Sequence, residues 1–315
     1  MSMNKIEGLI AAAFTPFHAD GSLNLGLVPE LVDKLYNDGL KGVFVCGSNG
    51  EGPNMTTAER MEVAEAFIKA AAGRLMVIVH VGHSSIAEAK ILAAHAVHAG
   101  ADAFSSVAAF YFKPVSVVNL ADCMAAIASA AKDLPFYYYH IPHLTGIGMD
   151  MVEFLQYAGP RIPNLAGIKY TATTLQEYQT LLNVDNGRHD ILFGLDELLL
   201  PALAVGAKGA IGSTYTFAAP LYKETIKAFE RGDMEAARAH HSYMVEMIRI
   251  LVKYPPIPGQ KAIMKMFGFD MGPCRLPLTT LSPESYDKFY GELNRIDFFS
   301  KLPLLKHQLT AERKI

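Results

Sequence analysis

Leu165-Ala166-Gly167-Ile168-Lys169-Tyr170 is a short apolar run that carries a single charged residue, Lys169, near its end. Such runs are typical of strands that are buried on both faces of a parallel sheet. Burial disfavours the charged form of an amine and lowers its pKa, and an unprotonated lysine amine is the nucleophile that forms a Schiff base with a carbonyl substrate. The alternative is that the lysine stem packs on the strand while its ammonium group reaches water.

Similar β-rich runs recur along the chain, and each is followed by a stretch with helical periodicity. We identify eight such runs: Leu9 to Phe14, Gly42 to Cys46, Leu75 to Val81, Ala103 to Val107, Phe136 to Tyr139, Leu165 to Tyr170, Ile191 to Gly194 and Gly209 to Gly212. The helices predicted between them include Thr57 to Ala72, Ser84 to Ala99 and Val115 to Lys132. Eight βα units predict an α/β fold of the (β/α)8 TIM-barrel class rather than an open doubly wound sheet.

The pattern changes after Gly232, where only helical periodicity remains. The helices predicted there are Asp233 to Lys253, Pro258 to Phe267 and Pro283 to Asn294. We therefore expect a barrel over residues 1–232, a C-terminal helical appendage packed on it over residues 233–300, and a polar tail over residues 301–315.

Composition restricts the class of partner. With 315 residues, 51% hydrophobic and 19% charged, the chain is expected to fold around a large core. Its formal net charge of -3 and its pI near 6.4 provide no basic surface for nucleic acid or for a membrane.

Met1 to Glu7 lacks the pattern of a secretory signal, so we expect a cytoplasmic location. Three distant cysteines without a C-x-x-C motif argue against disulfides and against a zinc site.

Polar residues follow several of the predicted strands. In a barrel of parallel strands the active site lies at the carboxyl ends of the strands, so these residues are expected to meet on one face. The segments are Gly47-Ser48-Asn49-Gly50-Glu51-Gly52, Tyr137 to Pro142, Lys169-Tyr170-Thr171, Gly194-Leu195-Asp196-Glu197 and Gly212-Ser213-Thr214-Tyr215. Together they supply an amine nucleophile, a phenol for proton transfer, a loop that can hold an anion, and acids and hydroxyls suited to a polyol.

These segments resemble the dihydrodipicolinate synthase-like family of class I pyruvate aldolases. Gly47 to Glu51 is similar to the family's G-[ST]-T-G-E loop, Tyr139-His140-Ile141-Pro142 to its Y-[NH]-[IV]-P motif, and Gly167-Ile168-Lys169 to its Schiff-base segment. The segments Gly194 to Glu197 and Gly212 to Tyr215 resemble the sugar-binding segments of its N-acetylneuraminate lyase branch, as does Met271 to Leu278.

The resemblance implies a role for each matching residue. Lys169 corresponds to the imine-forming nucleophile, and Tyr139 to the phenol that passes protons with the substrate carboxylate. Ser48 and Asn49 match the loop that holds the pyruvyl carboxylate. The residues that match contacts to the sugar chain are Thr171, Gly194, Asp196, Glu197 and Ser213. Tyr111 matches a tyrosine that reaches across a subunit interface, and the family implies a homotetramer. The implied substrates are a sialic-acid-type sugar acid and pyruvate, with a covalent imine on Lys169 and neither metal nor organic cofactor.

Two departures from the family pattern have consequences. Asn49 stands where the family has threonine, so a hydroxyl that could relay protons between tyrosines is absent. Leu144 stands where dihydrodipicolinate synthases carry an arginine for the carboxylate of their second substrate. An uncharged residue cannot form the bidentate guanidinium pair, which argues against the synthase reaction.

Three other interpretations remain open from the sequence. Another pyruvate-dependent aldolase of the same family is the nearest, either a 2-keto-3-deoxy sugar acid aldolase or a dihydrodipicolinate synthase. A metal-dependent aldolase is suggested by three H-x-x-H pairs, His80/His83, His95/His98 and His140/His143, although no carboxylate-rich ligand set accompanies them. A non-catalytic sugar-acid binding protein is the third, because a barrel does not by itself imply catalysis.

Overall fold

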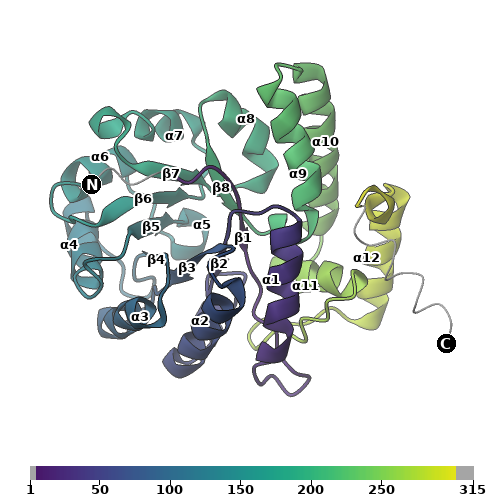
Figure 1. The fold of residues 1–315 in the computed structure, drawn as a ribbon, viewed down its shortest axis with the longest axis horizontal. Helices are drawn as coiled ribbons and strands as arrows, with labels where there is room; N and C mark the ends of the chain where they lie inside the picture. Colours follow the sequence, from purple (N-terminus) through teal and green to yellow (C-terminus); the bar gives the residue numbers. More distant parts are fainter. Residues whose placement is uncertain (1–4, 303–315) are drawn as a thin grey trace.

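The structure, a computed structural model, describes residues 5–302. Within that range eight parallel strands pair in chain order and the last pairs with the first, which closes a barrel (Figure 1). The strands are β1 (Gly8–Ala12), β2 (Gly42–Val45), β3 (Met76–His80), β4 (Ala103–Ser106), β5 (Phe136–His140), β6 (Leu165–Tyr170), β7 (Asp190–Phe193) and β8 (Gly209–Gly212). The predicted fold class is confirmed, and each predicted strand agrees with the observed one to within two residues.

Helices cover the outside of the barrel. Those that follow the strands are α1 (Val28–Asn37), α2 (Thr57–Ala71), α3 (Ile86–Ala99), α4 (Val117–Ala128), α5 (Pro142–Thr145), α6 (Met151–Ala158), α7 (Leu175–Leu181), α8 (Leu199–Ala204) and α9 (Tyr215–Glu230). A capping box explains where α2 begins, because Thr56 accepts from the Glu59 amide and the Glu59 carboxylate accepts from the Thr56 amide. The predicted helix from Val115 to Lys132 is shorter at both ends in the structure.

The strands bury side chains on both faces, as their continuous apolar sequences predict. One apolar cluster lies between the strands and the surrounding helices, and a smaller one fills the barrel interior. The interior cluster consists of Ile6, Ile10, Ala12, Phe44, Ile78, Ala103, Val107, Tyr137, Tyr139, Ile141, Ala166, Leu192 and Ile211. The barrel is therefore a packed core, and a ligand is accommodated only at its end.

A register shift in β6 sets the direction in which Lys169 points. Phe136 of β5 pairs with Leu165, but the next residue, Tyr137, pairs with Gly167, so β6 contains one extra residue. Such a bulge reverses the in-out alternation beyond it. Ala166 belongs to the interior cluster, whereas Ile168 and Tyr170 belong to the outer one. Lys169 consequently faces the barrel interior beside Tyr139, its register partner.

Three further helices follow the barrel: α10 (Met234–Leu251), α11 (Pro256–Met266) and α12 (Pro283–Arg295). Helix α10 packs along α9, and Figure 1 shows α12 on the outer side of this helical layer. The division of the chain at residue 232 stays a prediction. Most of the predicted tail, residues 303–315, lies outside the described residues.

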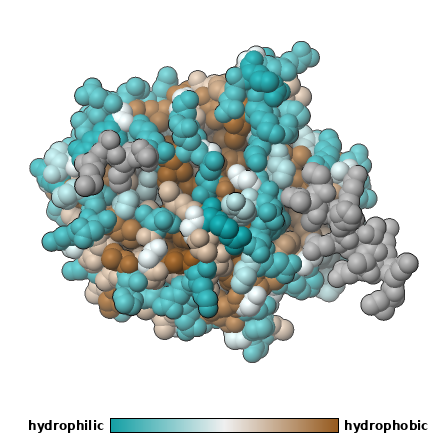
Figure 2. Space-filling model, in the orientation of Figure 1, coloured by the Kyte–Doolittle hydropathy of each residue, from teal (hydrophilic) through white to brown (hydrophobic). Residues whose placement is uncertain are grey.

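The surface of the helical layer is mainly hydrophilic on the face that Figure 2 shows. Figure 2 shows hydrophilic residues over most of the helices on the visible face, with hydrophobic residues mainly in the gaps between them. Among residues 5–302, no helix combines the length and apolar character that spanning a membrane requires.

Candidate active site

Lys169 is enclosed by aromatic rings at the carboxyl end of the barrel. Its side chain is 3% exposed, and its Nζ lies 4.0 Å from the ring centre of Tyr139 and 4.1 Å from that of Phe44. The amine is therefore buried at the base of the site and does not extend to the protein surface, as the alternative from the sequence would require. Burial lowers the pKa of Lys169 to about 7, while the negative charge of Asp196 opposes part of this shift. A large fraction of the amine is consequently neutral and nucleophilic near neutral pH.

Tyr139 is buried next to this amine. Its ring makes edge-to-face contacts with Phe44 and His80, at centroid distances of 5.5 and 5.9 Å. Burial raises the pKa of Tyr139 to about 12, although the neighbouring hydroxyls of Ser48 and Thr171 act in the opposite direction. The phenol is therefore protonated at neutral pH. It can transfer a proton only by accepting one while it donates its own.

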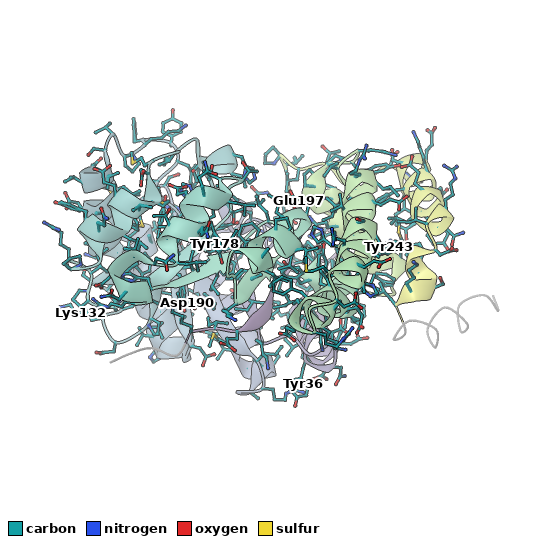
Figure 3. The ribbon with its side chains drawn as sticks, turned by 90° about the horizontal axis from the view of Figure 1, so that it is seen from above. Tyr36, Lys132, Tyr178, Asp190, Glu197 and Tyr243 are labelled. Atoms are coloured by element: carbon teal, nitrogen blue, oxygen red, sulfur yellow. The ribbon has the colours of Figure 1, made fainter. Side chains whose placement is uncertain are left out.

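A cavity of about 470 Å³ opens onto Lys169 and Tyr139. Nine of the ten predicted site residues line it: Ser48, Asn49, Tyr139, Lys169, Thr171, Gly194, Asp196, Glu197 and Ser213. Figure 3 shows Glu197 at one end of the barrel and Asp190, the first residue of β7, at the other. The structure thus brings together residues that are up to 165 positions apart in the sequence, at the end where the strands terminate.

The loop after β2 presents Ser48 and Asn49 to the cavity. Two residues that flank it, Cys46 and Glu51, adopt left-handed backbone conformations. Gly52 must lack a side chain because a Cβ there would lie 2.0 Å from the Cys46 carbonyl oxygen. The Asn49 amide lies 3.5 Å from the Ala12 carbonyl oxygen. Ser48 and Asn49 are half-buried, so a ligand carboxylate can reach both.

Asp196 is held in a fixed orientation at the start of the turn Asp196–Leu198. Its Oδ2 accepts hydrogen bonds from the amide and the hydroxyl of Thr214, at 2.8 and 2.7 Å. Burial raises its pKa to about 6, although both Thr214 hydrogen bonds oppose the shift. Gly212 allows this approach, because a Cβ at that position would lie 1.8 Å from Asp196 Oδ1. Asp196 and the half-buried Glu197 thus place two carboxyl groups in the cavity wall.

The C-terminal helices complete the cavity, which the sequence analysis did not predict. The end of α10 and the start of α11 contribute an apolar wall with one amide, Gln260. A buried ion pair joins this region to the loop after β2, since Lys261 Nζ lies 2.6 Å from Glu51 Oε1. Lys261 is the residue from which this contact could have been predicted. A charged residue within the predicted helix Pro258 to Phe267 suggests a buried partner, just as Lys169 stood out within its apolar strand.

Two other residues singled out in the sequence differ in their position relative to the cavity. Tyr111 is 78% exposed, contacts the ring of Phe112, and does not line the cavity of its own chain. Leu144 lines the cavity and is 60% exposed, so no guanidinium group occupies its position at the rim.

The histidine pairs were the basis of the metal-dependent interpretation. His80 and His140 are buried among aromatic rings, whereas His95 pairs with Glu65 on the surface at 2.8 Å. In the part of the chain that the structure describes, no three His, Cys, Asp or Glu side chains are grouped so that they could hold a metal ion.

Known proteins share this architecture over nearly the whole chain. Residues 5–296 match the model of the dihydrodipicolinate synthetase family. The chain is 38% identical over 314 residues to an N-acetylneuraminate lyase from Homo sapiens, with 98% of each chain covered. It is similar to the solved N-acetylneuraminate lyase (sialic acid aldolase) from Aliivibrio salmonicida, with a TM-score of 0.91, 40% identity, and 94% of this chain and 98% of that chain covered. A dihydrodipicolinate synthase from Aquifex aeolicus gives a TM-score of 0.85, 30% identity, and 93% and 99% coverage. The chain belongs to the dihydrodipicolinate synthetase family.

Proposed function

We propose that this chain is a class I aldolase that cleaves N-acetylneuraminate reversibly to N-acetylmannosamine and pyruvate. One observation carries the proposal: a lysine amine with a pKa of about 7 lies buried in the cavity beside a protonated tyrosine. The similarity to the Homo sapiens and Aliivibrio salmonicida lyases supports the substrate, because they are 38% and 40% identical to this chain whereas the Aquifex aeolicus synthase is 30% identical.

The reaction begins when the neutral Lys169 Nζ attacks the C2 ketone of the open-chain sugar acid to form a carbinolamine. With the uptake of one proton from solvent, water leaves and a protonated imine forms; the final hydrolysis returns this proton. The C3–C4 bond then breaks, and its electron pair moves to C3 and into the imine as an enamine. Tyr139 accepts the C4 hydroxyl proton while passing its own to the substrate carboxylate, which agrees with a phenol that stays neutral. N-acetylmannosamine leaves as the aldehyde. Protonation of C3 and hydrolysis then release pyruvate and regenerate the amine.

The remaining cavity residues are proposed to bind the two ends of the substrate. Ser48 and Asn49 hold the carboxylate, and an amide can donate to it although it cannot relay protons. Those that contact the hydroxyls of the sugar chain are Thr171, Gly194, Asp196, Glu197 and Ser213. The protonated imine supplies the electron sink, so the proposal requires neither metal nor organic cofactor.

A second pyruvate-dependent activity on the same lysine is the alternative. Leu144 disfavours dihydrodipicolinate synthesis, because it cannot pair with the carboxylate of an amino-acid substrate. A 2-keto-3-deoxy sugar acid aldolase would use the same imine chemistry with a different polyol.

Two measurements test the proposal. Borohydride reduction in the presence of pyruvate should add a stable pyruvyl mass to the peptide that contains Lys169. A coupled assay should detect pyruvate released from N-acetylneuraminate in the presence of EDTA. An unlabelled lysine contradicts the imine mechanism, and labelling without pyruvate release from any sialic acid contradicts the substrate. If Lys169→Arg and the wild type both bound sialic acid without turnover, the protein would be a binding protein.

We also propose that the chain assembles as a homotetramer in which Tyr111 contacts a neighbouring subunit. The exposure of Tyr111 and Phe112 supports this, since exposed aromatic residues on a loop are characteristic of interfaces. Sedimentation analysis should give four times the chain mass, and Phe112→Asp should reduce it. A monomeric wild type with full activity would contradict the assembly. A cytoplasmic location stays a prediction from the sequence.

A further inference from the structure

His80, the last residue of β3, connects three segments at the carboxyl end of the barrel. It is 3% exposed, and both of its ring nitrogens lie close to backbone groups of other segments. Nδ1 lies 3.1 Å from the carbonyl oxygen of Cys46, which directly follows β2. Nε2 lies 3.3 Å from the amide of Val107, which directly follows β4. One imidazole ring therefore joins the ends of β2, β3 and β4.

The partners of the ring determine which nitrogen carries its proton. A backbone amide can only donate, so Nε2 accepts from Val107 and the proton on Nδ1 is donated to the Cys46 carbonyl oxygen. Burial lowers the pKa of His80 well below its usual value, and the positive charges of Arg60 and Lys169 act in the same direction. His80 is consequently a neutral imidazole with one donor and one acceptor in fixed places.

Arg60 of α2 fixes the backbone that carries this ring. It is 1% exposed, and its guanidinium group donates to the carbonyl oxygens of His80 and Gly82, at 2.6 and 2.9 Å. Gly82 leaves the space that the imidazole occupies, because a Cβ there would lie 2.8 Å from His80 Nε2. The end of β3 therefore has little freedom to move.

The His80 ring also contacts Tyr139. The two rings are nearly perpendicular, at an angle of 89° and a centroid distance of 5.9 Å, and the Phe44 ring packs against both. Closely packed rings restrict one another's rotation, so His80 and Phe44 set the direction of the Tyr139 phenol.

The Cys46 carbonyl oxygen that His80 binds lies at the start of the loop that presents Ser48 and Asn49. Cys46 has a positive φ of 58°, which is unusual for a residue with a side chain. Such a conformation persists only where surrounding contacts hold it. The hydrogen bond from His80 is one of these contacts, so the position of the loop depends on it.

We propose that His80 is a positioning residue for both groups that handle the substrate carboxylate. Its ring holds Tyr139 in the orientation that proton transfer requires, and its Nδ1–H holds the loop that presents Ser48 and Asn49. This inference rests on the proposed function, which gives Tyr139 and the loop their roles. His80 itself does not line the catalytic cavity, so it acts through these neighbours.

Two substitutions separate the two contacts. His80→Phe keeps a ring against Tyr139 and removes both hydrogen bonds. His80→Asn keeps an N–H donor near the position of Nδ1 and removes the ring. The matched controls are His98→Phe and His98→Asn, the same exchanges at an exposed position of α3. Urea unfolding shows whether each variant is folded.

Two measurements report on the two contacts. Borohydride trapping is measured against pyruvate concentration, with so little borohydride that the imine stays at equilibrium. The half-saturating pyruvate concentration then reports the stability of the imine, which depends on the contacts to the pyruvate carboxylate. The kcat for cleavage of N-acetylneuraminate depends in addition on the rate of proton transfer through Tyr139.

We expect His80→Phe to raise the half-saturating pyruvate concentration about tenfold and to change kcat little, the effect of one or two neutral hydrogen bonds on the loop. His80→Asn should lower kcat about tenfold, as a small misplacement of a reacting group does, and change the half-saturating concentration little. Both His98 variants should behave as the wild type.

A role in the fold alone would change both quantities together in either variant. Such parallel changes, or values equal to those of the wild type, overturn the proposal, and one folded variant is enough to show it. If the wild type traps pyruvate but releases none from N-acetylneuraminate, the proposed function fails. The trapping curve of His80→Phe still tests the contact with the loop in that case, so the two failures are distinguishable.

Discussion

At the scale of single residues, the pKa of Lys169 determines how the reaction depends on pH. Only the neutral amine attacks a carbonyl, and the pKa of about 7 places its deprotonation between pH 6 and pH 8. The initial rate of borohydride trapping at low pyruvate concentration should therefore rise about tenfold over that interval. Asp196→Asn removes a negative charge that raises this pKa, so it should move the midpoint to lower pH. A rate that rises only above pH 9 would mean that the amine is solvated.

The same burial has a cost in stability, which Lys169→Met should remove. The ordinary pKa of 10.5 applies to the unfolded chain, so between pH 7 and pH 10.5 the folded state binds fewer protons than the unfolded state. Wild-type stability consequently increases with pH in that interval, and the penalty is complete below about pH 7.

We expect the inactive Lys169→Met variant to be more stable than the wild type by about 1–3 kcal/mol at pH 7. This is less than the whole shift implies, because the rings of Phe44 and Tyr139 stabilise the ammonium group. Urea unfolding at pH 7 and pH 9 measures the difference, which should shrink at the higher pH. A variant that is less stable at pH 7 would contradict the proposed desolvation penalty.

At the scale of elements, Gly212 at the end of β8 leaves the space that Asp196, in the turn after β7, occupies. An added Cβ would lie 1.8 Å from Asp196 Oδ1 and 2.6 Å from the Tyr215 ring, so Gly212→Ala must displace the carboxylate. We expect kcat/KM for the sugar acid to fall by roughly tenfold to a hundredfold, as small misplacements of a binding group typically cause. Pyruvate trapping on Lys169 should change much less.

Gly148→Ala is the control for this prediction, because a Cβ at Gly148 meets no atom within 4 Å. Equal effects of the two glycine variants, or an equal loss of trapping and cleavage in Gly212→Ala, would show that Gly212 supports the fold rather than the position of Asp196.

Local sequence patterns predicted the elements well but not every direction of a side chain. The eight strands and the polar residues after them follow from short-range signals, so the barrel and the meeting of Ser48 with Asp196 could be predicted. The bulge in β6 could not, because it arises from the pairing with β5. Without it the alternation from Ala166 would have directed Lys169 away from the interior.

At the scale of the whole molecule, the sequence predicted the three helices α10 to α12 but not that α10 and α11 close the site. Their contribution depends on contacts more than 200 positions apart along the chain. The Glu51 carboxylate accepts from the Arg275 amide at 2.8 Å, and the Arg275 guanidinium group forms a bidentate ion pair with Glu59. Such contacts do not alter the hydrophobic periodicity of the sequence. The only indication of them in the sequence is a charged residue within an apolar helix, as at Lys261.

The buried ion pair between Glu51 and Lys261 should therefore couple the C-terminal helices to the loop that holds Ser48 and Asn49. The Glu51 side chain is fully buried and that of Lys261 is 4% exposed, and Lys261 also donates to the Pro273 carbonyl oxygen at 3.1 Å. Lys261→Met leaves a carboxylate without its partner, and Glu51→Gln leaves an amine without one. The free energy of unfolding, measured with urea, should fall by about 3–5 kcal/mol in each single variant, and in the double variant by clearly less than the sum of the two losses.

The double variant, if folded, should need a higher pyruvate concentration for half-maximal trapping, because the loop that holds Ser48 and Asn49 is displaced. Its maximal trapping rate should change little, because Lys169 is not displaced. Additive losses of stability, or a pyruvate dependence equal to that of the wild type, would show that the two regions of the molecule are independent.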